Sequence, residues 1–229
     1  MDGPILFFQD GNIDLLNKKI ISIVGTRKIT TYGISFCEKL IADLAPFNPV
    51  IVSGFAYGID ICAHKAAIAN GLQNIACLAH GMHKIYPKAH KKYMPDVLKN
   101  GGFISEFWSS DPFNRNNFLK RNRIIAGMSQ ATIVIESAAK GGSLVTADIA
   151  NSYSRDVFAV PGRATDTQSQ GCNMLIKTHQ ASIITSAADL VYHLGWDLDE
   201  TQKPNLPSQV VTPLDGEEKI LYNFLKDKD

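Results

Sequence analysis

The residues of this sequence whose types and spacing best fit the binding of a polyanion lie between Phe118 and Ala147. An apolar run at 131–135 reads as a buried strand, and a loop of small residues then leads into a predicted helix. Such a loop lets backbone N–H groups approach a phosphate, and the helix end adds about half a positive charge. The candidate phosphate-binding residues are Lys140, Gly141, Gly142, Ser143 and Thr146.

An aromatic and basic segment precedes that strand. Residues 115–123 contain four cations and no acid, and Phe118 lies among them. Cations neutralise a phosphate backbone and an aromatic ring can stack on bases, so this combination favours single-stranded nucleic acid. A core position is the alternative for Phe118.

A second candidate site follows the apolar run at 19–24, where Gly25, Thr26 and Arg27 form a predicted turn before a helix. A dinucleotide-binding fold has a second glycine where this turn has Arg27. The arginine blocks close approach of a pyrophosphate, but its fork suits phosphate oxygens or a base edge. The alternative is a surface arginine after a strand.

Three other groups of residues are also considered. The segment 83–92 has four lysines, two histidines and no acid, and within it Lys88 is expected to contact phosphate. Asp60 and His64 lie four residues apart on a predicted helix and are expected to pair as a structural hydrogen bond. The cysteines form no CxxC pair and are expected to be small buried side chains, which disfavours a metal site; they are Cys37, Cys62, Cys77 and Cys172.

The alternation of apolar runs with helical segments predicts a Rossmann-like α/β fold, with a doubly wound, mostly parallel sheet and helices on both faces. Strands are expected at 4–8, 19–24, 49–53, 74–79, 102–106, 131–135, 156–160 and 181–185. Helices are expected at 31–44, 59–70 and 88–100, from 143 onward, and at 171–177 and 186–194. Ligands of such sheets bind at the carboxyl ends of the strands, so the predicted sites should gather at one edge.

The 229 residues carry a net charge of +1, with 45% apolar and 20% charged residues, which is typical of a globular protein. No apolar run approaches the roughly 20 residues of a membrane span and no signal peptide is recognised, so we expect a cytoplasmic protein. The expected organisation is a Rossmann-like domain at 1–196, a proline-rich linker at 197–213 and the first helix of a truncated C-terminal domain at 214–229.

A series of motifs resembles, in order, those of the bacterial DNA-processing family called DprA or Smf, over about residues 4–195. The motifs are IVGTRKITTYG, SGFAYGIDICAHKAA, the segment from His80-Gly81 to Tyr86-Pro87, FLKRNRIIAG, ESAAKGGSLVTADIA, VFAVPGR and QGCNMLIK. The resemblance implies an extended Rossmann fold in a dimeric protein that binds single-stranded DNA and helps to load the RecA recombinase during natural transformation. It implies no enzymatic activity and no cofactor. Members often carry an N-terminal helical domain, expected to be absent here, and a winged-helix-like C-terminal domain.

The resemblance also implies roles for individual residues. The implied DNA-binding residues are Gly25, Thr26, Arg27, Lys88, Phe118, Lys120, Arg121, Asn122 and Arg123. The implied phosphate pocket comprises Gly141, Gly142, Ser143 and Thr146. Lys140 precedes Gly-Gly-Ser where many members have Ser-Gly-Ser, and this departure adds a cation.

Two other functions are weighed. A nucleotide phosphoribohydrolase-like enzyme on a related fold would carry a Pro-Gly-Gly-x-Gly-Thr-x-x-Glu motif, but the loop at 140–148 lacks its proline and its glutamate. Glu136 is a candidate acid for such an enzyme, or else a carboxylate that accepts hydrogen bonds from backbone amides. An NAD-binding domain is disfavoured by the missing GxGxxG and the missing acid after the second strand.

Overall fold

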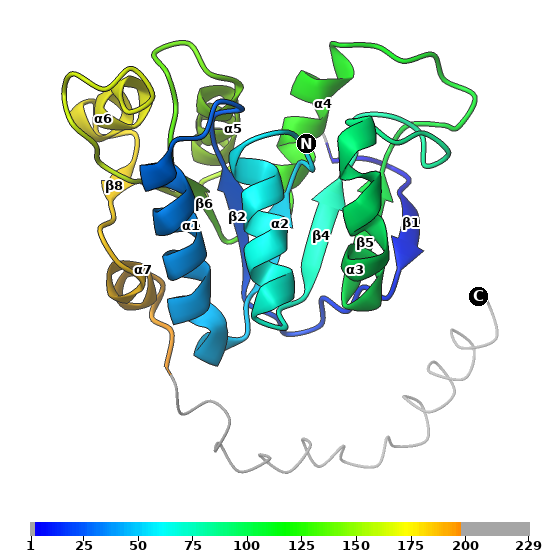
Figure 1. Cartoon of the computed structure of the whole chain (residues 1–229), viewed down its shortest axis with the longest axis horizontal. Coiled ribbons are helices and arrows are strands. Elements are labelled where there is room, and N and C mark those ends of the chain that lie inside the picture. The colour runs from blue at the N-terminus through cyan, green and yellow to red at the C-terminus, as the bar shows by residue number, and fades with distance from the viewer. Residues whose placement is uncertain (1–2, 198–229) are drawn as a thin grey trace, which may run out of the picture. The chain divides into compact units, whose positions relative to one another are not determined.

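A computed structural model describes residues 3–197, and its central feature is an eight-stranded sheet in the order β1-β5-β4-β3-β2-β6-β7-β8 (Figure 1). Neighbouring strands are parallel except for β1, which runs antiparallel to β5, so the predicted mostly parallel sheet is confirmed. The strands are β1 (Phe8–Gly11), β2 (Ile20–Val24), β3 (Val50–Ser53), β4 (Asn74–Cys77), β5 (Gly101–Ser105), β6 (Ala131–Val134), β7 (Asp156–Ala159) and β8 (Ser182–Ile183). Residues 198–229, with most of the predicted linker and the predicted C-terminal helix, lie outside the described residues.

The strand order reverses between β2 and β6. From β2 the chain adds β3, β4 and β5 on one side, and it then returns to place β6 on the other side of β2. The register pairs Ile21 with Ala131 and Val24 with Val134, so both strands end level with each other. The turns that follow β2 and β6 therefore flank a topological switch point, where ligands of open α/β sheets bind.

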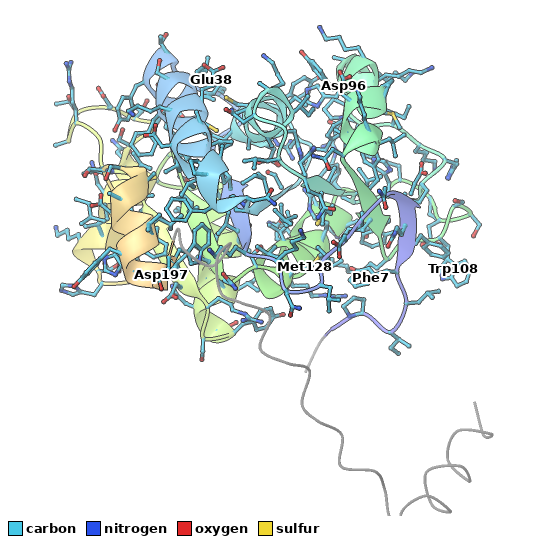
Figure 2. The ribbon with its side chains drawn as sticks, turned by 90° about the horizontal axis from the view of Figure 1, so that it is seen from below. Phe7, Glu38, Asp96, Trp108, Met128 and Asp197 are labelled. Atoms are coloured by element: carbon cyan, nitrogen blue, oxygen red, sulfur yellow. The ribbon has the colours of Figure 1, made fainter. Side chains whose placement is uncertain are left out.

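Helices cover both faces of the sheet, as predicted (Figures 1 and 2). One face carries α1 (Thr31–Leu44), α2 (Ile59–Ala69), α3 (Met94–Lys99) and α7 (Ala187–Leu194). The other carries α4 (Asn117–Met128), α5 (Gly142–Ser152) and α6 (Gln170–Lys177). Alternate strand residues face the two layers: Ile21 and Ile23 pack under α1 and α2, whereas Val24 packs under α4 and α5.

Local signals set several boundaries where they were expected. The side chain of Thr30 accepts a hydrogen bond from the Gly33 N–H (3.2 Å) and starts α1. Ser186 and Asp189 form a capping box at the start of α7. Gly71 follows α2 with a positive φ, as expected of a residue that ends a helix. All four cysteines are buried, which agrees with their expected role.

Three parts of the sequence differ from expectation. The first strand is expected at 4–8, but it is β1, Phe8–Gly11. Its position is decided by its pairing with β5. The single helix expected at 88–100 is instead a 3-10 helix, η2 (Lys88–Tyr93), followed by α3, because Pro95 has no N–H with which to continue a helix from η2. No element is expected at 117–128, and this segment forms α4. A further 3-10 helix, η1 (Ala45–Phe47), follows α1.

None of the helices within residues 3–197 has the length and hydropathy needed to cross a bilayer.

Candidate nucleic-acid binding pocket

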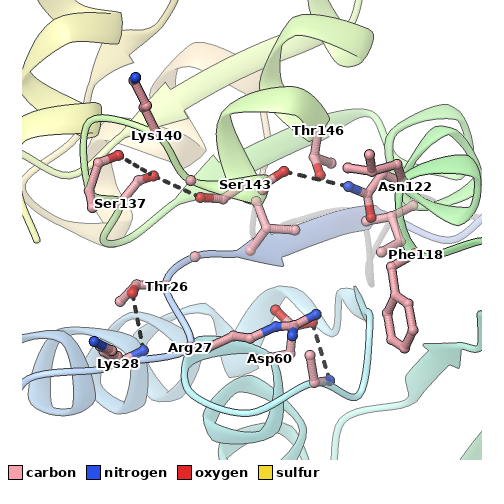
Figure 3. A pocket seen from close by; sticks show the side chains of 18 of the residues that line it. Thr26, Arg27, Lys28, Asp60, Phe118, Asn122, Ser137, Lys140, Ser143 and Thr146 are labelled. Atoms are coloured by element: carbon pink, nitrogen blue, oxygen red, sulfur yellow. Dashed lines mark hydrogen bonds between the residues drawn. The ribbon is translucent and has the colours of Figure 1, made fainter. Parts of the chain in front are cut away.

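A pocket of about 500 Å³ opens at the switch point, at the carboxyl ends of β2 and β6 (Figure 3). Its walls come from the turn after β2, the start of α2, the first turns of α4 and the loop that leads from β6 into α5. Figure 3 shows Ser137, Ser143 and Thr146 on one side and Arg27 and Asp60 on the other. Segments that are far apart in the sequence thus meet at one edge of the sheet, as the strand pattern predicts.

The turn after β2 directs Arg27 outward. A Cβ on Gly25 would collide with the side chain of Ile59, so only glycine fits there. The Thr26 N–H donates to the Glu136 carbonyl (2.7 Å), and its hydroxyl donates to the side-chain oxygen of Gln168 (2.7 Å). With its neighbours held in this way, Arg27 projects as an exposed side chain at the mouth of the pocket.

The Arg27 guanidinium contacts an aromatic ring, and its positive charge also acts on the nearby Asp60 carboxyl, where it favours a lower pKa. Its central carbon lies 5.5 Å from the centroid of the Phe118 ring, within the range of a cation–π interaction. Throughout residues 3–197, no hydrogen bond or ion pair engages the Arg27 side chain. All of its N–H donors therefore remain available to a ligand.

Arg121 forms the floor of the pocket. Its side chain is only 3% exposed and donates to the backbone carbonyls of Gly54 (2.7 Å) and Cys77. Its guanidinium also lies 6.0 Å from the Phe118 ring, so this ring contacts both arginines. Burial lowers the pKa of Arg121, while the nearby Asp60 carboxylate opposes that shift. The Asp60 carboxyl is itself buried, and desolvation raises its pKa against the attraction of Arg121.

The expected pairing of Asp60 with His64 is wrong. The His64 ring Nδ1 instead lies 3.0 Å from the side-chain oxygen of Asn74 on β4. Asp60 accepts a hydrogen bond from the Ala56 N–H (3.3 Å) and faces Arg121. The two residues share a face of α2, but Asp60 lies in the first turn beside the pocket and His64 lies one turn deeper against the sheet.

The loop before α5 provides the opposite wall. The Ser143 hydroxyl donates to the Ser137 hydroxyl (3.0 Å), which also lies against Gly141, so a side chain on Gly141 would collide with it. Gly142 differs, because no atom lies within 4 Å of a Cβ built there. The Gly142 and Ser143 amides at the start of α5 have no partner inside the helix, whereas the Leu144 N–H donates to the Gly141 carbonyl (3.1 Å). Open space in front of Gly142 leaves the two amides room for an anion.

The charge of the pocket is mostly positive. Its lining includes four cationic residues and one carboxylate, that of Asp60. Three of the cations are exposed at the mouth, namely Arg27, Lys28 and Lys140. The arrangement suits an anion that enters from solvent and reaches the start of α5.

Eleven of the residues predicted as site residues line this pocket: Gly25, Thr26, Arg27, Phe118, Arg121, Asn122, Lys140, Gly141, Gly142, Ser143 and Thr146. Three others lie outside it. Lys88 is exposed at the start of η2 and Lys120 is exposed on α4, whereas Arg123 forms an ion pair with Glu106. For these three residues, DNA contact stays a prediction.

Four polar residues line the pocket without having been predicted: Lys28, Asp60, Ser137 and Gln168. Lys28 directly follows the predicted site residue Arg27, and Ser137 lies two residues after the predicted strand at 131–135, so the strand-end rule could have found both. Gln168 belongs to the polar segment after β7, and its distance of 2.7 Å from Thr26 depends on the sheet order.

Glu136, the candidate catalytic acid, is buried and has a structural role. Its carboxylate accepts hydrogen bonds from the Thr30 N–H (3.0 Å) and the Thr30 hydroxyl at the start of α1. It also lies so close to Gly33 that a side chain there would collide with it. The sequence leaves Glu136 as either a catalytic acid or an acceptor of backbone hydrogen bonds, and in the structure it accepts them. Among residues 3–197, no cluster of three or more His, Cys, Asp or Glu side chains could hold a metal ion.

Comparison with known proteins identifies relatives of this chain. The chain is 40% identical over 190 residues to the DNA processing protein DprA of Streptococcus pneumoniae, covering 83% of this chain and 67% of that protein. The X-ray structure of that protein superposes with a TM-score of 0.78. Protein Smf of Escherichia coli is 36% identical over 198 residues, covering 86% of this chain and 53% of that protein. The chain thus spans about half to two thirds of the length of these relatives.

A third relative is described as a DNA-binding protein. The structure of DNA processing protein A from Helicobacter pylori, studied for its mode of single-stranded DNA binding, superposes with a TM-score of 0.77. It is 29% identical, and the match covers 84% of this chain and 88% of that one. In addition, the sequence model of the DNA recombination-mediator protein A family matches residues 1–195. The chain therefore belongs to the DNA recombination-mediator protein A family, whose named relatives are the DprA and Smf proteins.

Proposed function

We propose that the switch-point pocket binds single-stranded DNA. The observation that carries this proposal is the exposed Arg27 guanidinium, which faces the Phe118 ring next to the open start of α5. A phosphate needs cations and free N–H donors, and a base needs a flat apolar face. Arg27 and the α5 amides supply the first, and Phe118 supplies the second. The Helicobacter pylori relative, which is described as binding single-stranded DNA, supports this choice of ligand.

Each wall has its own part in the proposal. One phosphate lies at the start of α5, where Gly142 leaves space and Lys140 adds a positive charge. Arg27 contacts a second phosphate or the edge of a base, while the adjacent base lies near Phe118. Arg121 lies at the floor, where its Nη1 donates to two backbone carbonyls, and its positive charge adds to the field of the pocket.

We infer that the protein acts by binding and has no catalytic role. The named relatives are DNA processing proteins with no enzymatic activity in their names. The one carboxylate considered as a catalytic acid, that of Glu136, is engaged at the start of α1. The proposal needs no cofactor, since cations and backbone amides suffice to bind a phosphodiester.

Loading of RecA and dimer formation complete the proposed function. They rest on the family resemblance and on the short length of one pocket, because a strand held by two adjacent protomers is bound more tightly than by one. The loading step is testable by the rate at which RecA forms filaments on DNA coated with single-strand-binding protein. Addition of the full chain should raise that rate, and an Arg27→Ala variant should not.

The direct test is a fluorescence-anisotropy titration with a labelled dT oligonucleotide at two salt concentrations. Arg27→Ala should weaken binding about tenfold or more, since it removes a charge-assisted contact. It should also flatten the dependence of log K on log salt by about 0.7 for each phosphate that the variant no longer neutralises. Arg155→Ala is the matched control, because Arg155 is an exposed arginine that precedes β7, at the opposite edge of the sheet.

Equal loss of affinity in both variants would show that net charge, and not the position of Arg27, causes the effect. It would refute the assigned site. If the parent protein bound no single strand even at low salt, the proposed function itself would fall.

A further inference from the structure

Three aromatic side chains form a cluster at the edge of the pocket. The Tyr86 ring lies 5.2 Å from the ring of Phe113 and 5.5 Å from the ring of Phe118, and the last two lie 5.8 Å apart (centroid distances). The ring planes meet at 54° to 70°, so none of these rings is stacked face to face on another. In an edge-to-face contact the edge of one ring lies against a face of the other, so such contacts hold the rings in place without stacking them in parallel.

Exposure differs between the members of this cluster. Tyr86 is 41% exposed and Phe113 is 44% exposed, although both are large aromatic side chains. Phe118 is half-buried, and its ring centroid lies 5.5 Å from the Arg27 guanidinium and 6.0 Å from that of Arg121. Within residues 3–197, neither of the two more exposed rings has a cation over it. The His80 ring lies 6.5 Å from the Phe113 ring at an interplanar angle of 32°, so it lies beside one part of Phe113. The exposed remainder of Tyr86 and Phe113 offers aromatic surface to a stacking partner.

We propose that Tyr86 and Phe113 form a second base-stacking position, which receives the bases next to the one at Phe118. This inference rests on the proposed function of the pocket and extends it along the strand. The path is continuous, because Arg27 contacts Phe118 and Phe118 contacts both other rings. Stacking on aromatic rings tolerates any base, so the position suits a strand of arbitrary sequence.

The surroundings of the two rings match a nucleic-acid strand better than an apolar partner. Lys88 lies two residues after Tyr86, Arg115 lies two residues after Phe113, and both cations are exposed. Lys84 donates to the Asp111 carbonyl (2.9 Å) and so ties together the two loops that carry the rings. Cations beside open rings fit a chain of alternating phosphates and bases. In this arrangement Lys88, which lies outside the pocket, would contact a phosphate beside the base at Tyr86.

The test uses Tyr86→Leu and Phe113→Leu with two labelled oligonucleotides of equal length, one of dT and one made of abasic nucleotides. Trp108→Leu is the control, because Trp108 is 57% exposed on the same connection between β5 and α4. Its ring packs against that of Phe8 on β1 (centroids 4.9 Å apart), and Figure 2 shows Trp108 at the β1 edge of the sheet. Each cluster variant should bind dT about fivefold or more weakly than the parent, and bind the abasic strand as the parent does. The control should match the parent on both.

Photo-cross-linking provides a second readout that does not depend on the variants. An oligonucleotide carrying 5-iododeoxyuridine should cross-link to the peptides that contain Tyr86 and Phe113. Equal weakening of dT and abasic binding would refute stacking, as would cluster variants that bind dT like the Trp108 control. If only Arg27→Ala lowered the affinity for dT, the pocket would stand and this second position would fall. An absence of any binding by the parent would instead refute the proposed function.

Discussion

The mouth and the floor of the pocket each present an arginine to the same ring, yet the two arginines differ in almost every other respect. Arg27 lies 5.5 Å and Arg121 lies 6.0 Å from the centroid of Phe118. Arg27 is exposed on a turn after β2, whereas Arg121 is 3% exposed on α4. The comparison shows that access to water and the number of acceptors within the protein decide what a cation does.

The physical reason lies in desolvation. A buried guanidinium is tolerated only where acceptors replace its water, and Arg121 has the Gly54 and Cys77 carbonyls together with the attraction of Asp60. Removal of Arg121 would leave the two buried carbonyls without this donor and Asp60 without this positive charge. Arg27 keeps its water, so its removal should cost binding and leave the fold intact.

The largest expected effect is on the floor. Arg121→Ala should lower the free energy of unfolding by about 3–5 kcal/mol, because it removes the larger of the two positive charges that act on the buried Asp60 carboxyl. Urea denaturation followed by circular dichroism measures this change. Lys120→Ala, on the exposed face of the same helix, is the control and should change stability little. A stable Arg121→Ala protein that failed only in DNA binding would make Arg121 a ligand residue like Arg27.

The pH dependence of stability gives the next effect. Burial lowers the pKa of His64 from 6.5 to about 4, so the folded protein holds this ring neutral. The unfolded chain takes up the proton first, near pH 6.5, and stability should therefore fall as pH drops from 6.5 towards 4. The decrease amounts to about 3 kcal/mol from this group. His64→Gln should flatten the slope of unfolding free energy between these pH values, and an unchanged slope would contradict the assignment.

A pair of adjacent glycines separates structure from binding on the opposite wall. Gly141→Ala should destabilise the protein by about 1 kcal/mol or more, because its methyl group meets the Ser137 hydroxyl. Gly142→Ala should keep the stability of the parent, since the space is empty, but it should weaken dT binding severalfold by narrowing access to the α5 amides. Thermal melts and anisotropy titrations measure the two effects. Reversal of this pattern would place the phosphate elsewhere.

The smallest effect is expected at Arg123, which lies between the two cases because it is 21% exposed and paired with Glu106. Glu106→Gln should lower the free energy of unfolding by about 1 kcal/mol. It should change dT affinity less than twofold, since Arg123 does not line the pocket. A marked gain in dT affinity would show that Glu106 masks a DNA-binding cation.

Local residue patterns determined much of this protein. Continuous apolar runs specified parallel strands, Thr30 set the start of α1 at Thr31, and the loop at 140–143 predicted the phosphate-binding wall. The strand-end rule placed the turn after β2 and that loop at one edge, because parallel strands all end there. These features depend on neighbours in sequence, or on a rule common to all such sheets.

The tertiary structure decided which polar groups are paired and which are open. His64 bonds to Asn74 and not to Asp60, and Arg123 pairs with Glu106. Arg121 donates to two carbonyls at strand ends. Each partner comes from a segment that only the strand order brings near. Arginine has the same chemistry at positions 27 and 121, and the sequence predicted DNA contact for both. Burial separates them, because it results from packing between distant segments and not from the residues on either side.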